Sequence, residues 1–300
     1  MTEPMEWRLH FGVHKTATTH LQDTLYLQRA TLAEAGISVI PRVASRDVSL
    51  GRTLCGIGWR GLIPVAVRRM MFSADLDRLS CAGPVIVWSE ENLIGRPEEM
   101  LSVPMFPRLE NRLLNLAVAT RGARHRLFLS VRDPADILPS IYAQSLRTGP
   151  PRFEFDDLLR DWLDRPPRWS DLVARIMAVF MDAPLTVWPM ESYTKDPQQI
   201  LQRLTGSDLV RDLDLSPPAG TRRPSSRAVA ALEALPRGLR GSAWRTRADE
   251  ILAADHGEPP FDPLTTGQRN LLGDAYRADL SAMQDAGVEI MTGVGPGRDA

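Results

Sequence analysis

The 300-residue sequence is poor in cysteine, with only Cys55 and Cys81. Two cysteines cannot build the disulfide framework typical of small secreted domains, so we expect a reducing compartment. No apolar run is long enough to span a membrane, and the first eight residues do not begin a signal peptide. A formal net charge of −1 gives no reason to expect a nucleic-acid partner. These absences predict a soluble, cytoplasmic, globular protein whose oligomeric state stays open.

Lysine is equally scarce, because only Lys15 and Lys195 appear among 36 basic residues. Arginine meets the need for positive charge elsewhere, so a lysine indicates a position that requires a compact ammonium group. Lys15 lies in a loop between an apolar run, 9–13, and a helical pattern, 18–35. The order strand, tight loop and helix gathers backbone N–H groups around one point and predicts a phosphate site.

The loop is not a Walker A motif, which would require glycine in place of Leu9 and His14. It resembles the 5′-phosphosulfate loop of sulfotransferases that use 3′-phosphoadenosine 5′-phosphosulfate (PAPS). The residues in register with that loop are Gly12, Lys15, Ala17, Thr18 and Thr19. Alanine at position 17 departs from the usual glycine. The resemblance implies that Lys15 stabilises charge on the bridging oxygen, while Thr16, Ala17, Thr18 and Thr19 hold the 5′-phosphate.

A second stretch, 130–140, resembles the 3′-phosphate motif of the same family. Arg132 follows an apolar strand and Ser140 comes eight residues later, the spacing that the family uses to hold the 3′-phosphate. Arg132 offers a planar fork to a phosphate, although an ion pair with Asp133 or Asp136 is the simpler alternative. We expect Pro139 to break or kink the following helix, which would bring the backbone amide of Ser140 to the site as well.

Acidic side chains follow another apolar strand, 85–88, where open α/β sheets bind ligands. Sulfuryl transfer requires a base that removes the proton of the attacking hydroxyl or amine. The resemblance to bacterial sulfotransferases selects Glu90 as this general base. Because successive strand residues face opposite ways, only one of Glu90 and Glu91 is expected to reach the site, and Glu91 is the second choice. His14 in the loop is a further candidate. Arg222 and Arg223 are weaker candidates for another phosphate contact.

Strands at 37–40, 85–88, 127–131 and 185–188 alternate with helical patterns, which predicts a three-layer α/β fold with a mainly parallel sheet and a P-loop-like phosphosulfate loop. The alternation stops near residue 207. We therefore expect an α/β nucleotide-binding domain over 1–206 and a helical C-terminal extension over 207–300 packed on it.

The resemblance, which covers about residues 7–205, implies a metal-independent sulfotransferase. Such an enzyme transfers a sulfuryl group from PAPS to a hydroxyl or amine of a glycan or small molecule and releases adenosine 3′,5′-bisphosphate. Two alternatives remain: a P-loop kinase or NTPase, with 85–90 as a poor Walker B strand, and a non-catalytic nucleotide-binding protein with the sulfotransferase fold. The sequence does not identify the acceptor.

Overall fold

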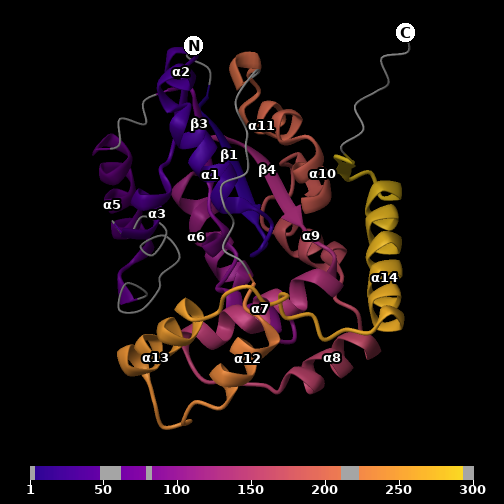
Figure 1. The fold of residues 1–300 in the computed structure, drawn as a ribbon. Helices are drawn as coiled ribbons and strands as arrows, with labels where there is room; N and C mark the ends of the chain where they lie inside the picture. The colour runs from indigo at the N-terminus through magenta and orange to yellow at the C-terminus, as the bar shows by residue number, and fades with distance from the viewer. Residues whose placement is uncertain (1–3, 48–61, 79–82, 211–222, 293–300) are drawn as a thin grey trace.

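The computed structural model describes residues 4–47, 62–78, 83–210 and 223–292, so Cys55, Cys81 and Arg222 lie outside the described part. Within it, six parallel strands form one sheet in the order β2-β3-β1-β4-β5-β6 (Figure 1). The strands are β1 (Glu6–Gly12), β2 (Ile37–Val39), β3 (Val85–Ser89), β4 (Arg124–Val131), β5 (Leu185–Pro189) and β6 (Glu289–Ile290). The expected α/β class and parallel sheet are confirmed.

Helices cover both faces of this sheet. Those named below are α1 (Thr18–Leu27), α2 (Arg29–Glu34), α3 (Arg42–Asp47), α5 (Val65–Arg78), α6 (Leu109–Ala119), α7 (Pro134–Thr148), α8 (Phe155–Asp164), α9 (Trp169–Met177), α10 (Met190–Lys195), α11 (Pro197–Thr205), α12 (Ser226–Glu233), α13 (Gly241–Ala253) and α14 (Thr266–Asp285). Short 3-10 turns are η2 (Glu91–Leu93), η3 (Pro97–Leu101) and η4 (Asp208–Val210).

Two apolar clusters separate the three layers. Helices α1, α2, α10 and α11 pack with Val87, Phe128 and Trp188 on one face of the sheet. Helices α6 and α9 pack with Leu9 and Phe11 on the other face. Neighbouring residues of a strand point to opposite faces, so the nearly continuous apolar strands fill both clusters.

Strand β1 is the point at which the chain changes direction across the sheet. The chain builds β2 and β3 on one side of β1, then β4, β5 and β6 on the other. In open α/β sheets, ligands bind beyond the carboxyl ends of the strands at such a switch point. The loop that contains Lys15 leaves β1 at this place.

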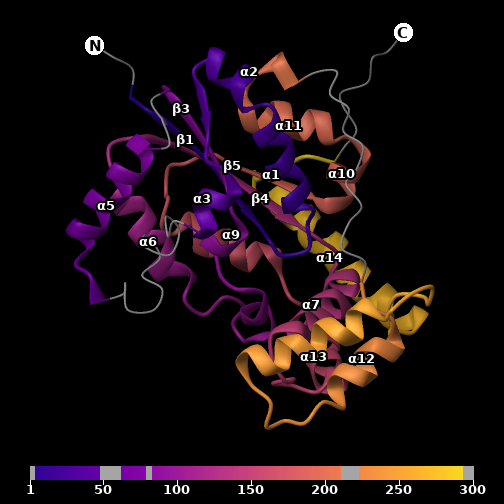
Figure 2. The same ribbon diagram turned by 60° about the vertical axis from the view of Figure 1, so that its left-hand side comes forward.

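The segment after residue 207 does not form a core of its own. Side chains of α12, α13 and α14, among them Leu232, Trp244 and Tyr276, belong to the same apolar cluster as Leu9 and Phe11 of β1. Helices α12 and α13 lie together with α7 at one end of the molecule (Figure 2). Strand β6 also pairs with β5, so this segment adds a strand that the sequence pattern did not predict.

Of the break or kink expected at Pro139, the break is absent, because α7 is continuous from Pro134 to Thr148. Proline removes one helical hydrogen bond, which tertiary packing can offset. Here Ile137, Leu138 and Ile141 are fully buried around the proline. Ser140 consequently lies inside a helix rather than at a helix N-terminus, and its backbone amide is not directed toward the site.

Candidate functional site

The loop between β1 and α1 has an unusual backbone. Lys15 has φ 71° and Ala17 has φ 59°, both in the left-handed region. Turns of this kind aim successive N–H groups into one concavity. The backbone N–H groups of residues 15 to 19 make no hydrogen bond to another described residue. Five neighbouring donors are therefore available to an anion at the start of α1, where the helix dipole adds positive potential.

Gly12 allows the helix to start this close to the strand. A Cβ at Gly12 would collide with the Oγ1 atom of Thr18, the first residue of α1. Thr18 is buried and Thr19 is exposed, so the two hydroxyls that the sequence groups together lie in different environments. Gly12 is thus required by close approach, which explains a glycine at the end of a buried strand.

A buried chain of hydrogen bonds lies beneath the loop. His10 Nδ1 is 2.8 Å from Ser89 Oγ, and His10 Nε2 is 3.0 Å from Ser130 Oγ. Ser130 Oγ is 2.6 Å from Thr16 Oγ1, which donates to the carbonyl oxygen of Val13 at 2.5 Å. Strand register explains the meeting, since His10 lies opposite Ser89 and Ser130 opposite Gly12.

The bond to Val13 fixes the direction of every proton in this chain. Thr16 gives its only hydroxyl proton to Val13, so Ser130 must donate to Thr16 and His10 Nε2–H must donate to Ser130. His10 Nδ1 then accepts from Ser89. Burial lowers the pKa of His10 to about 3, which keeps the imidazole neutral. The hydroxyl of Thr16, expected to contact the 5′-phosphate, holds the loop instead, and only its amide is available.

Lys15 lies in a cluster of cations. Burial and, to a smaller extent, the charges of Arg147, Arg132 and Arg223 together lower the pKa of Lys15 to about 8. No hydrogen bond or ion pair joins its ammonium group to another residue in the described ranges. Three arginines and one unpaired ammonium repel one another, and a bound anion would relieve that repulsion.

Arg132 is brought to the loop from the end of β4. Its Nη1 donates to the carbonyl oxygen of Lys15 at 2.9 Å, and its Nη2 lies 3.8 Å from Asp136 Oδ2. Arg223 joins this group by donating to the carbonyl oxygen of Asp136 at 3.2 Å. Ser140 is 8% exposed, and its hydroxyl has no hydrogen-bond partner within the described part of the chain. The structure thus places Lys15, Arg132 and Arg223 together.

Glu90 and Glu91 differ sharply in their surroundings. Glu90 is 2% exposed, and its Oε1 accepts from the backbone N of Asn92 at 3.0 Å, which caps η2. Glu91 is half-buried, and its Oε2 accepts from Gln22 Nε2 at 3.4 Å. Glu90 is therefore the more buried of the two, and its carboxylate is bonded within the turn that follows the strand.

The negative charge of Glu91 acts on the imidazole of His14. The side chain is buried, and Nε2 donates to the carbonyl oxygen of Gly95 at 2.9 Å, which leaves Nδ1 without a proton in the neutral ring. Burial lowers the pKa of His14, and the negative charge of Glu91 opposes this shift. Both groups therefore lie on the β3 side of the loop, opposite the arginines.

No protein-family model matches the chain, and no curated protein matches it either. None of the described helices combines the length and the apolar character needed to cross a membrane. In the ranges that the structure describes, no three His, Cys, Asp or Glu side chains are grouped to hold a metal ion.

The left-handed backbone of Ala17 indicates that glycine would stabilise the protein at this position. Ala17→Gly is expected to raise the free energy of unfolding by about 0.5–1 kcal/mol, because glycine adopts φ 59° without the Cβ penalty. The measurement is urea denaturation, with a higher midpoint and an unchanged slope. Ala278→Gly, at an exposed position inside α14, is the control and should lose about 1 kcal/mol. Equal losses in both variants would contradict strain at position 17.

Proposed function

We propose that this protein is a PAPS-dependent sulfotransferase. The observation that carries the proposal is a set of five backbone N–H groups beside the ammonium of Lys15, all without a partner in the described part of the chain, with Arg132 bonded to the carbonyl oxygen of Lys15. These donors suit the 5′-phosphosulfate, and Arg132, Ser140 and Arg223 suit the 3′-phosphate. The resemblance of the two sequence stretches supports the same assignment.

Each group of the site has a separate role in sulfuryl transfer. The acceptor oxygen or nitrogen attacks sulfur, the bond between sulfur and the bridging phosphate oxygen breaks, and the electron pair of that bond remains on the phosphate. Lys15 stabilises the charge that develops on the bridging oxygen, and the loop amides fix the phosphate in line. A protein base accepts the proton of the acceptor.

We assign that base to Glu91, with His14 as the alternative. Glu90 is buried and its carboxylate caps η2, so its role is to stabilise the turn in which Glu91 is the first residue. Glu91 is half-buried and lies on the side of the loop where His14 is found. Glu90, selected on resemblance, is therefore replaced in this role by its neighbour.

The environment of Thr16 argues against the kinase alternative. In a Walker A loop, the hydroxyl that follows the lysine binds Mg²⁺. Here that hydroxyl is 3% exposed and donates to the Val13 carbonyl. Calorimetric titration with adenosine 3′,5′-bisphosphate without metal, and separately with Mg-ATP, tests the proposal. Preference for Mg-ATP would overturn it, and binding of the bisphosphate without turnover of PAPS would leave only a nucleotide-binding protein.

Arg132 is expected to select for the 3′-phosphate. Arg132→Ala should weaken adenosine 3′,5′-bisphosphate more than adenosine 5′-phosphate, by about 1.5–3 kcal/mol, because the lost charged contact faces the 3′-phosphate alone. Calorimetry with both nucleotides measures the difference. Arg269→Ala is the control, since Arg269 bonds to the same Asp136, at 3.1 Å, and should affect the two nucleotides equally. A uniform loss in Arg132→Ala would restrict Arg132 to holding the loop.

A further inference from the structure

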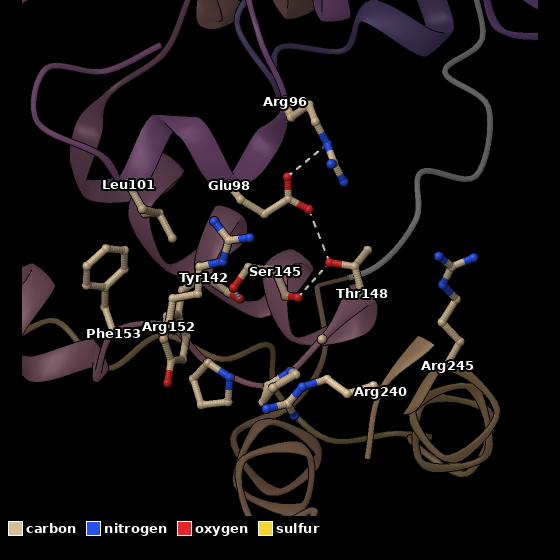
Figure 3. Close-up of a pocket in the computed structure, with 13 residues that line it drawn as sticks. Arg96, Glu98, Leu101, Tyr142, Ser145, Thr148, Arg152, Phe153, Arg240 and Arg245 are labelled. Carbon is tan, nitrogen blue, oxygen red and sulfur yellow. Dashed lines mark hydrogen bonds and ion pairs between the residues drawn. The ribbon is translucent and has the colours of Figure 1, made fainter. Parts of the chain in front are cut away.

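A cavity of about 490 Å³ lies between the end of α7, the segment 96–101, the loop 149–153 and α13 (Figure 3). Its volume is in the range of small-molecule binding sites. Four arginines from three separate segments line it, namely Arg96, Arg152, Arg240 and Arg245, against a single carboxylate, Glu98. Figure 3 shows Arg96 and Glu98 on one side of the cavity and Arg240 and Arg245 on the other.

The positive charge of this cavity is only partly compensated. Glu98 is shared between Arg96, at 3.5 Å, and the hydroxyl of Thr148, at 3.1 Å. Arg152 and Arg245 form no hydrogen bond or ion pair with any residue in the described ranges. Two guanidinium groups therefore line the cavity without a counter-charge from the described residues, and each can bind a carboxylate or sulfate in a bidentate manner.

Part of the remaining lining is apolar. Phe153 is 45% exposed, and Pro150, Pro151 and Leu101 line the same cavity. An exposed aromatic ring beside prolines offers a face against which a sugar ring can pack. The cavity thus combines ring-packing surfaces with cations at its rim.

The cavity adjoins the loop that contains Lys15. Thr148, which lines it, follows Arg147, whose charge lowers the pKa of Lys15. The ring of His14 donates to the carbonyl oxygen of Gly95 at 2.9 Å, and Gly95 precedes Arg96, which lines the cavity. The loop that contains Lys15 is therefore bonded, through His14, to the segment that continues into one wall of the cavity.

We propose that this cavity binds the acceptor and that the acceptor is an anionic saccharide with two or more negative groups. This inference rests on the proposed function. Arg152 and Arg245 would bind the negative groups, Phe153 and the prolines would contact the ring faces, and a hydroxyl or amine would point toward Lys15.

The test is calorimetric titration of the full-length protein, saturated with adenosine 3′,5′-bisphosphate, with a tetrasaccharide that contains glucuronic acid. Arg152→Gln and Arg245→Gln should each weaken binding about tenfold, as expected for loss of a charged contact at a partly exposed site. Arg247→Gln removes the same charge from the same helix, α13, but outside the cavity, where Arg247 pairs with Glu250, and should leave affinity unchanged. The carboxyl-reduced tetrasaccharide should bind more weakly than the acidic one.

Equal binding of the acidic and reduced tetrasaccharides, or equal losses in Arg245→Gln and Arg247→Gln, would overturn the inference. Competition between the tetrasaccharide and the nucleotide would also overturn it, because donor and acceptor must bind together. If the bisphosphate binds and the tetrasaccharide does not, only this inference fails. If the bisphosphate does not bind, the proposed function fails, and the acceptor assignment falls with it.

Discussion

Lys15→Ala is expected to lower turnover of PAPS about 10²–10³-fold, while affinity for adenosine 3′,5′-bisphosphate falls much less. Charge on the bridging oxygen develops in the transition state, so a group that stabilises it raises kcat more than it raises binding. The five loop amides remain in place in the variant and still hold the phosphate. Pre-steady-state turnover at saturating PAPS, together with calorimetry on the bisphosphate, separates the two effects.

Two control variants sharpen this result. Lys195→Ala removes the only other lysine, which lies exposed at the end of α10, and should leave turnover unchanged. Lys15→Arg keeps the charge but replaces a compact ammonium with a planar fork, so it should recover binding better than turnover. A Lys15→Ala variant with lower affinity but normal kcat at saturation would contradict the leaving-group role.

The same residue predicts a pH dependence. The pKa of Lys15 is about 8 in the protein without ligand, and a bound anion raises it by supplying the opposite charge. Affinity for adenosine 3′,5′-bisphosphate should therefore be highest below pH 8 and fall as the pH rises above it, because the ammonium loses its proton. Lys15→Ala should lack this step between pH 7 and 10. A step that persists in the variant would assign it to another group.

Local sequence pattern predicted the parts of the site that are close along the chain. Gly12, Lys15 and Ala17 lie within six residues, and their meaning depends on a strand, a turn and a helix in that order. Ala17 has a left-handed φ, and the sulfotransferase loops that this loop resembles usually have glycine at that position. The one residue that departs from the family pattern therefore has a strained backbone. Long strands and helices were likewise predictable from periodicity.

Other features of the structure depend on contacts between distant parts of the chain, which the local sequence does not reveal. His10 is the single polar residue of the apolar run 9–13, and only the register of β3 and β4 brings Ser89 and Ser130 to its two nitrogens. Strand β6 has only two residues and pairs with β5 from a distant part of the chain, so it carries no periodic signal of its own. Pro139 is tolerated because α7 is buried, a property of the packed molecule and not of the local sequence.

The difference between Glu90 and Glu91 depends on the 3-10 turn that follows β3. Strand alternation predicted that one of Glu90 and Glu91 would reach the site, but not which one. The 3-10 turn η2 begins at Glu91, and the carboxylate of Glu90 folds back onto the amide of Asn92. Residue spacing alone contains no signal for this capping interaction.

Glu91→Gln is expected to reduce turnover by about 10²–10⁴-fold, the usual contribution of a positioned general base. The amide retains the shape of the side chain and can still bond to Gln22, so affinity for the bisphosphate should change little. Turnover of PAPS with a competent acceptor, compared at saturating substrate between this variant and the unaltered protein, measures the loss.

Glu90→Gln is the matched comparison, one residue away and of identical chemistry. Its amide can still accept from the backbone of Asn92, although loss of the charge weakens the cap, so this variant should lose stability and keep its turnover per folded molecule. Thermal unfolding of both variants shows which loss is structural. A fall in turnover confined to Glu90→Gln would return the role of base to that residue, and normal turnover in both variants would transfer it to His14, whose Nδ1 is the remaining proton acceptor beside the loop.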